Sequence, residues 1–286
     1  MIDKVSIYGG TGFIGSNYVN KFEDECTIIP REERAPRSSN VLYFISTVHN
    51  YNIFDKPLLD IETNLITLIE TLEKCKSRED IVFNFVSSWF VYGKTQDLPA
   101  REDSHCNPTG FYSITKRAAE QMLVSYCETF NLKYRILRLG NVYGTGDVKA
   151  SKQKNALQHL ISEVVAGRDI NLYDGGRNIR DFLHVEDACE AINLAIKKLP
   201  TNEVTNIGSG EPQDLISIME HVRNKVNSRS RFNFVKPPEF HKIVQIKDMY
   251  LETSKLKSAG FKQKIGTYKG VDMLVDNLRR DAAYSR

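Results

Sequence analysis

A strand that runs directly into a glycine turn and a helix constrains the fold of this chain more than any other feature. Val5-Ser6-Ile7-Tyr8 has the apolar character of a short buried strand, and glycines at 9, 12 and 15 precede a helical pattern that continues through Phe22. In such a unit the first glycine permits the tight turn, the second lets the backbone approach a pyrophosphate, and the third lets the helix pack closely on the sheet. The helix N-terminus then offers free N–H groups to the phosphates. The spacing predicts a dinucleotide-binding turn, and a purely structural turn is the alternative.

Strand and helix patterns alternate through the first half of the chain. Apolar strand-like runs at 41–45, 81–86 and 134–139 are separated by helical patterns at 60–74 and 111–130. This alternation favours an α/β fold, a Rossmann-type doubly wound parallel sheet with a smaller C-terminal substrate-binding lobe.

We predict an NAD(P)-binding domain at 1–143, with a return segment at 180–209, and a region at 144–286 that mainly forms the substrate-binding lobe. Only a loop rich in proline, arginine and serine separates Ile29 from Val41. A dinucleotide fold often has another helix and strand there, so we expect a domain trimmed near its adenine edge.

A candidate proton-transfer set follows the strand-like run at 81–86. Tyr112 and Lys116 stand four residues apart on a predicted helix and so share one face, and Ser88 ends the preceding strand. An ammonium group near a phenol lowers the phenol pKa, and a serine hydroxyl can orient an alcohol or a carbonyl. We therefore predict Ser88, Tyr112 and Lys116 as catalytic residues. A tyrosine and a lysine at this spacing also occur by chance on exposed helices, which is the alternative.

The choice between NAD and NADP depends on the residues after the second strand. An acidic side chain at this point usually holds the ribose 2′-hydroxyl of NAD, whereas an arginine accommodates the 2′-phosphate of NADP. Arg31 and Arg34 favour NADP, and Glu32 and Glu33 keep NAD open.

Composition excludes several other classes of protein. The chain has 286 residues with a formal net charge of +3, which is too small and too evenly spread to indicate nucleic-acid binding. No apolar run approaches the length of a membrane span, and the N-terminus has no signal-peptide pattern. The five cysteines and six histidines lack metal-ligand spacing, so we expect no metal site and a cytoplasmic protein with reduced thiols.

Several motifs occur together and in order, and together they resemble the extended short-chain dehydrogenase/reductases. They are GGTGFIG at 9–15, SSWFVYG at 87–93, YSITK at 112–116, LRLGNVYG at 137–144, RDFLHVEDA at 180–188 and NIGSG at 206–210. More narrowly, the chain resembles the NAD-dependent epimerase/dehydratase family, whose members act on nucleoside-diphosphate sugars.

The resemblance implies a role for each matching residue. Tyr112 becomes the general acid/base at a sugar hydroxyl, Lys116 holds the nicotinamide ribose and lowers the Tyr112 pKa, and Ser88 occupies the catalytic Ser/Thr position. The predicted cofactor contacts are Gly9, Thr11, Gly12, Phe13, Ile14, Gly15, Arg31, Arg34, Ser46, Thr47, Ser87, Tyr112, Lys116 and Leu139. The predicted substrate contacts are Trp89, Phe90, Asn141, Asn155, Tyr173 and Arg180.

Some of these substrate contacts have structural alternatives. Asn141, Asn155 and Arg180 match positions that usually contact the nucleotide diphosphate, but Asn141 could instead cap a turn. Arg180 could instead form a surface salt bridge with Asp181 or Glu186.

The chain also departs from the family pattern. Family dehydratases carry Asp-Glu after the catalytic threonine, whereas Trp89 and Phe90 occupy these positions and cannot transfer protons. These rings are expected to stack on a sugar or close the pocket, with packing at the strand end as the alternative. Family members often place an arginine for the second phosphate before the segment that matches 251–255. No arginine lies between Arg231 and this segment, so Lys242 and Lys247 are considered as substitutes.

The expected activity is reduction of a 4-keto sugar nucleotide at C4 with NADP as cofactor. NAD-dependent 4-epimerisation is the alternative, and a non-catalytic NADP-binding regulatory protein is a more distant one. The family also implies a homodimer formed by helices around 60–75 and 112–130, although Met122 on the second of these could equally pack inward.

Overall fold

The strand-like runs of the first half form one parallel sheet of six strands. The computed structural model describes residues 4–95, 97–147 and 155–284, with side chains described to residue 280. In their order across the sheet, the strands are β2 (Cys26–Ile28), β1 (Val5–Tyr8), β3 (Asn40–Tyr43), β4 (Val82–Ser88), β5 (Lys133–Leu139) and β9 (Glu203–Ile207). All five pairings between neighbours are parallel.

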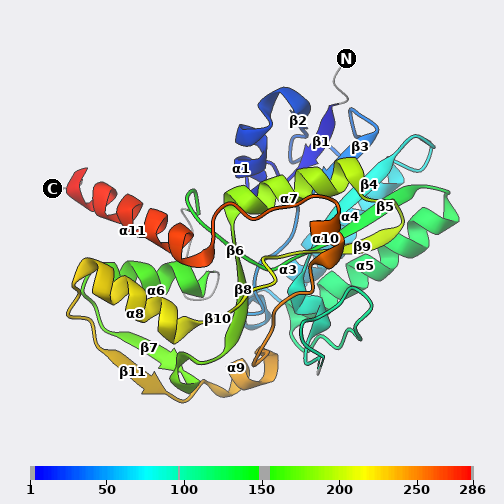
Figure 1. Ribbon diagram of the computed structural model, residues 1–286. Helices are drawn as coiled ribbons and strands as arrows, with labels where there is room; N and C mark the ends of the chain where they lie inside the picture. Colours follow the sequence, from blue (N-terminus) through cyan, green and yellow to red (C-terminus); the bar gives the residue numbers. More distant parts are fainter. Residues whose placement is uncertain (1–3, 96, 148–154, 285–286) are drawn as a thin grey trace.

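Helices cover both faces of this sheet because successive residues of each strand point to opposite sides. In β3, Leu42 packs in a core with α1 (Phe13–Lys21) and α7 (Val185–Lys198), whereas Val41 and Tyr43 pack in a second core on the other face. Figure 1 shows α7 and α5 on either side of the sheet. The predicted fold class, a doubly wound Rossmann-type sheet, is confirmed.

The second face is covered by two long helical segments. One comprises α3 (Leu58–Ile61), a π-helical turn (Glu62–Ile66) and α4 (Thr67–Glu73), and the other is α5 (Phe111–Thr129). The short helix α2 (Asn52–Asp55) precedes them. The 3.6-residue pattern therefore predicted both helical segments to within a few residues, but not the π turn.

The connection from β2 to β3 is short. Residues 29–39 contain neither helix nor strand, and β3 pairs directly with β1 on the side opposite β2. The loop is held to β1, because the Tyr8 hydroxyl donates to the Arg34 carbonyl at 2.7 Å and Ser6 Oγ accepts from the backbone N–H groups of Arg37 and Ser38. The trimmed edge expected from the sequence is present.

Much of the second half forms a separate lobe with its own hydrophobic core (lower left in Figure 1). A three-stranded sheet contains β6 (Asn141–Tyr143), β8 (Ile179–His184) and β10 (Pro212–Asp214), and a two-stranded sheet contains β7 (Ile170–Tyr173) and β11 (Phe232–Val235). The lobe helices are α6 (Ala156–Val165), α8 (Leu215–Val226) and α11 (Thr267–Tyr284). Two short helices, α9 (Glu239–Val244) and α10 (Ser254–Ser258), complete the described α-helices.

The chain returns to the large sheet only in part of the segment 180–209. α7 and β9 join that sheet, whereas β8 pairs with β6 and β10 in the lobe. The division into two domains stays a prediction. Among the helices that the structure describes, none is both long enough and apolar enough to cross a membrane.

Candidate active site

The glycine turn between β1 and α1 has the geometry that its spacing predicts. Gly9 has a φ of +77°, a conformation that residues with a side chain rarely adopt. A Cβ atom at Gly15 would lie 2.3 Å from the Gly9 carbonyl oxygen, so helix and turn approach too closely for any other residue. A Cβ atom at Gly12 would lie 3.4 Å from the same carbonyl oxygen, and no other atom beyond the adjoining residues lies within 4 Å of it. Gly12 therefore leaves open space in front of the N-terminus of α1.

That open space belongs to a cavity of about 290 Å³ that extends from the glycine turn to Tyr112. Of the predicted cofactor residues, the cavity is lined by Gly9, Gly12, Phe13, Ile14, Gly15, Ser46, Thr47, Ser87, Tyr112, Lys116 and Leu139. A glycine cradle at a helix N-terminus, open where a Cβ atom would project, fits the pyrophosphate of a dinucleotide.

Three predicted cofactor residues lie outside this cavity lining: Thr11, Arg31 and Arg34. Arg34 forms an ion pair with Glu70 of α4 at 2.9 Å and donates to the Arg31 carbonyl at 2.6 Å. The Arg31 side chain is exposed. Because its guanidinium is already paired with a carboxylate, Arg34 is a weaker candidate for a 2′-phosphate than the sequence suggested.

The three predicted catalytic residues come from neighbouring elements. Ser88 ends β4 and Tyr112 lies in the first turn of α5, and both line the same cavity. Ser88 Oγ accepts from the Phe90 N–H at 3.3 Å and so caps the turn that follows the strand. Parallel strands bring their carboxyl ends to one edge, which explains why distant residues meet here.

Burial dominates the electrostatics of the Tyr112–Lys116 pair. Hydrogen bonding from Ser88 and Ser46 lowers the pKa of Tyr112. Burial has the larger effect, so the pKa of Tyr112 lies above its usual value. Burial also lowers the pKa of Lys116 to about 7. Lys116 Nζ donates to the Val86 carbonyl at 2.8 Å and lies 4.0 Å from the centre of the Phe85 ring. The predicted lowering of the Tyr112 pKa by Lys116 is therefore not seen, since the ammonium is directed at a carbonyl and a ring.

A second cavity, of about 320 Å³, lies between the sheet and the lobe. All six predicted substrate residues line it: Trp89, Phe90, Asn141, Asn155, Tyr173 and Arg180. The residues that line both cavities are Val48, Ser88, Tyr112, Gly140, Val142 and Asn155. A ligand in one cavity therefore meets a ligand in the other at Ser88 and Tyr112.

Arg180 is almost fully buried and its guanidinium is hydrogen-bonded to backbone carbonyl groups. It therefore does not form the surface salt bridge that was the alternative from the sequence. Its guanidinium donates to the carbonyls of Ile179 at 2.6 Å, Lys247 at 2.7 Å and Ile246 at 2.7 Å, and lies over the Trp89 ring at 5.5 Å. Burial lowers its pKa to about 10, which still leaves the group charged at neutral pH. Arg180 thus brings a positive charge to the cavity and fixes the segment 246–247 in its wall.

The aromatic pair after Ser88 forms part of the same wall. The Trp89 and Phe90 rings are stacked with centres 4.0 Å apart, and Phe90 meets Tyr112 edge to face at 6.0 Å. Trp89 is buried, which agrees with a role in packing at the strand end. Phe90 is partly exposed, which agrees better with a role in closing the pocket.

The two predicted asparagine contacts also have structural partners. Asn141 Nδ2 donates to the Asp181 carbonyl at 3.2 Å, and Asn155 caps α6 by accepting from the Gln158 N–H at 3.3 Å. Both side chains still line the second cavity.

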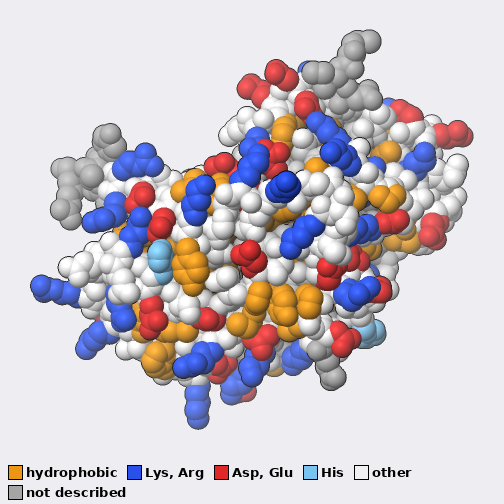
Figure 2. Space-filling model, in the orientation of Figure 1, with side chains coloured by type: hydrophobic (Ala, Val, Ile, Leu, Met, Phe, Trp, Pro, Cys, Tyr) orange, Lys and Arg blue, Asp and Glu red, His pale blue; other side chains and the backbone are white. Residues whose placement is uncertain are grey.

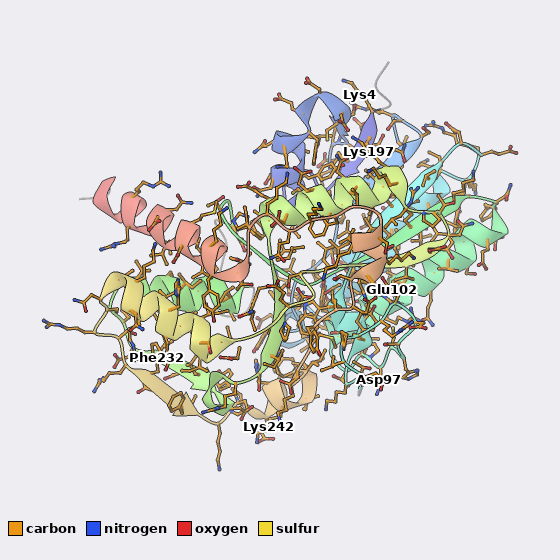
Figure 3. The ribbon with its side chains drawn as sticks, in the orientation of Figure 1. Lys4, Asp97, Glu102, Lys197, Phe232 and Lys242 are labelled. Atoms are coloured by element: carbon orange, nitrogen blue, oxygen red, sulfur yellow. The ribbon has the colours of Figure 1, made fainter. Side chains whose placement is uncertain are left out.

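The lysines considered for a second phosphate lie elsewhere. Lys242 is exposed, pairs with Glu239 within α9 and lies on the outer side of that helix (Figure 3). Lys247 is also exposed. Its backbone carbonyl accepts a hydrogen bond from Arg180 in the cavity wall, but its side chain takes no part there. The basic side chain that α9 contributes to the cavity is His241.

Sequence reasoning missed several residues of the second cavity. His49 and Tyr51 follow β3, and His241 and Gln245 come from α9 and its end. Tyr51 and His241 are joined by a hydrogen bond of 3.2 Å between the hydroxyl and Nδ1. The position of 49–51 just beyond a strand end was an available signal, whereas the sequence around 241 carries no motif.

Comparison with known proteins identifies the family. The model of the NAD dependent epimerase/dehydratase family matches residues 41–208, which is more than half of the chain. The "Putative UDP-glucose 4-epimerase" of Methanocaldococcus jannaschii is 24% identical over 309 residues, covering 97% of this chain and 99% of that protein. These findings confirm the resemblance noted in the sequence.

Solved structures agree on the fold. The UDP-glucose 4-epimerase of Thermotoga maritima with UDP-glucose has a TM-score of 0.86 at 23% identity, with 98% of this chain and 99% of that chain covered. The UDP-glucose 4-epimerase of Thermus thermophilus in complex with NAD has a TM-score of 0.83 at 24% identity, with 96% and 99% covered.

Proposed function

The chain belongs to the NAD dependent epimerase/dehydratase family, and we propose that it is an NAD-dependent 4-epimerase of a UDP-sugar. It is an enzyme that acts on sugar nucleotides, within the extended short-chain dehydrogenase/reductases. The names of the similar proteins from M. jannaschii, T. maritima and T. thermophilus support epimerisation as the reaction.

The observation that carries the proposal is the meeting of the two cavities at Ser88 and Tyr112. One cavity begins at a glycine cradle suited to a pyrophosphate, and the other contains a buried arginine and an aromatic pair. A sugar carbon in the second cavity can therefore face a nicotinamide in the first, with Tyr112 beside both.

The residues would act in a defined order. When bound, NAD would accept a hydride from the sugar C4 and later return it. Tyr112, as phenolate, takes the proton of the C4 hydroxyl, and Ser88 donates a hydrogen bond to the same oxygen as it becomes a carbonyl. Lys116 holds the nicotinamide ribose. After the 4-keto sugar turns over in the cavity, Tyr112 returns the proton, and the C4 configuration is inverted.

Substrate binding would use the second cavity. Arg180 gives the diphosphate a positive charge that is already held in place, and Asn141 and Asn155 offer amide groups around it. The cavity must also let the keto sugar turn over, and Phe90 and Tyr173 give that space apolar walls.

Two other reactions of this family are less consistent with these residues. Dehydration needs ionisable groups where Trp89 and Phe90 stand. The 4-keto reductase favoured from sequence relied on Arg31 and Arg34 as NADP ligands, and Arg34 is paired with Glu70. The proteins of known structure that bind NAD also support NAD as the cofactor here.

The test is to incubate the purified protein with UDP-glucose, UDP-N-acetylglucosamine and UDP-glucuronic acid, without added cofactor. Products are separated by chromatography, and the nucleotide released by denaturation is identified. We expect a 4-epimer of one substrate and release of NAD. Turnover only of a 4-keto sugar with external NADPH would contradict the proposal in favour of the reductase. Nucleotide binding without any turnover would instead favour the regulatory alternative.

A further inference from the structure

The serine side chains that share the cofactor cavity with Tyr112 include Ser46 as well as Ser88. Ser88 ends β4, and Ser46 lies three residues beyond the end of the adjacent strand β3. Both line the cofactor cavity together with Tyr112, and side-chain hydrogen bonding from each lowers the Tyr112 pKa. Ser46 was expected only as a cofactor contact, so its position beside the proton-transferring group needs an explanation.

The proposed reaction requires more hydrogen-bond donation than Ser88 alone can give. A serine hydroxyl has a single proton to donate. While Ser88 donates that proton to the sugar oxygen, it cannot also donate it to the Tyr112 phenolate. A buried phenolate without a donor is costly, because burial disfavours the charged form.

Ser46 is held where it can supply the missing donor. Its Oγ donates to the Thr47 carbonyl at 2.6 Å and lies 3.1 Å from Asn64 Oδ1, so two acceptors are already within reach of one proton. Rotation about the Cβ–Oγ bond redirects this proton, and Tyr112 lines the same cavity as the serine.

Asn64 ties this serine to the helix that carries Tyr112. The Asn64 amide lies on the π turn, accepts from the Thr47 N–H at 2.9 Å and donates to Thr115 Oγ1 at 2.9 Å. Thr115 Oγ1 in turn lies 3.0 Å from the Tyr112 carbonyl. The strand-end loop and the first turn of α5 are therefore linked through the buried Asn64 side chain.

The charged groups around Tyr112 make a neutral donor more important. Asp60 of α3 is fully buried and its carboxylate disfavours a second negative charge nearby. Lys116, on the same helix as Tyr112, donates to the Val86 carbonyl. Hydrogen bonding from the two serine hydroxyls acts in the opposite direction to Asp60 and lowers the Tyr112 pKa.

We propose that Ser46 is a positioning residue for proton transfer. Its hydroxyl accepts a hydrogen bond from neutral Tyr112 and donates one to the Tyr112 phenolate, which leaves Ser88 free for the sugar oxygen. The inference deepens the proposed function and rests on it for the role of Ser88.

The first test is the pH profile of kcat/KM for epimerisation, whose acid limb reports the pKa of the base in the free enzyme. Loss of a donor to the phenolate raises that pKa. In Ser46→Ala we expect the limb to move up by about one pH unit or more. Ser46→Cys, nearly equal in volume but a weak donor, should move the limb in the same direction. Ser46→Thr, which keeps the hydroxyl, should leave it in place.

A second readout does not need the proposed reaction. The ultraviolet absorbance of tyrosinate is titrated in the purified protein, and the contribution of Tyr112 is the difference from Tyr112→Phe. Ser46→Ala or Ser46→Cys should raise the pH at which this contribution appears, and Ser46→Thr should not. An unchanged titration in both donor-deficient variants, or a rate that falls equally at all pH values, would overturn the role of Ser46. Absence of epimerase activity in the wild type, with the titration shifted as expected, would overturn only the proposed function.

Discussion

The two cavities that meet at Tyr112 are lined by different kinds of residue. Glycines, serines and a threonine make up eight of the 19 residues that line the cofactor cavity, and most of them lie at the strand ends of one sheet. The substrate cavity is lined by large side chains from segments far apart in the sequence, such as Trp89, Arg180 and His241. Backbone geometry therefore determines the first cavity and side-chain identity determines the second. This difference explains why a family pattern predicts the cofactor side well and the sugar poorly.

The largest effect is expected where the two cavities share a wall. Tyr112→Phe removes the proton-transferring oxygen but keeps the ring that meets Phe90 edge to face. We expect kcat to fall by about 10²–10⁴-fold, while the bound NAD and the affinity for UDP-sugar stay within a few-fold of wild type. Turnover close to wild type would remove Tyr112 from the mechanism.

The glycine turn tests whether backbone geometry alone builds the cofactor side. In Gly15→Ala the new Cβ atom would lie 2.3 Å from the Gly9 carbonyl, so we expect a loss of about 1–3 kcal/mol in the free energy of unfolding together with loss of bound NAD. Gly12→Ala is the matched variant, because its Cβ atom meets the same oxygen at 3.4 Å. It should bind NAD less well at nearly unchanged stability. Thermal unfolding and nucleotide content separate the two outcomes, and equal stability in both variants would refute the packing argument.

The substrate side should depend on single side chains. Arg180→Lys keeps the charge but loses the planar fork that donates to the carbonyls of Ile246 and Lys247. We expect the KM for the UDP-sugar to rise by about tenfold, with bound NAD unchanged. Lys242→Met is the control, because Lys242 lies outside the cavity lining. Loss of NAD in Arg180→Lys would show that the two cavities are not independent.

The smallest effect on catalysis is expected on a face that belongs to neither cavity. Exposed apolar side chains gather on α2, α3, the π turn and α5, namely Ile53, Phe54, Leu58, Ile66, Ile114 and Met122. We propose that a second copy of the chain covers this face. On the face of the molecule that Figure 2 shows, charges of both signs are interspersed.

Leu58→Glu should weaken this dimer and leave kcat within about twofold. Phe234→Glu on β11 is the matched control, since Leu58 is 63% exposed and Phe234 is 64% exposed. Light scattering reports the mass of each variant. An unchanged mass for Leu58→Glu, or an equal change in both variants, would place the interface elsewhere.

The sequence predicted what depends on local periodicity and failed where distant segments meet. Alternation of strand and helix patterns located α5 and the sheet, and the glycine spacing located the turn. The pairing of Arg34 with Glu70 joins a loop to α4, and no local pattern encodes it. The contribution of His241 depends on how α9 packs against the loop after β3, through Tyr51. The hydrogen bond from the Lys116 ammonium to the Val86 carbonyl likewise depends on three-dimensional packing.

The backbone contacts of Arg180 also have a consequence for the order in which the chain becomes functional during synthesis. The last strand of the large sheet, β9, ends at Ile207, whereas the carbonyls that Arg180 binds belong to residues 246–247. In Figure 1 the orange stretch after α9 crosses from the lobe to the sheet at this point. A growing chain on the ribosome can therefore complete its dinucleotide site while the wall of the sugar-nucleotide site is still to be translated. A chain that ended before residue 246 would contain the glycine turn but would lack the two backbone carbonyls, at 246 and 247, that hold Arg180 in place.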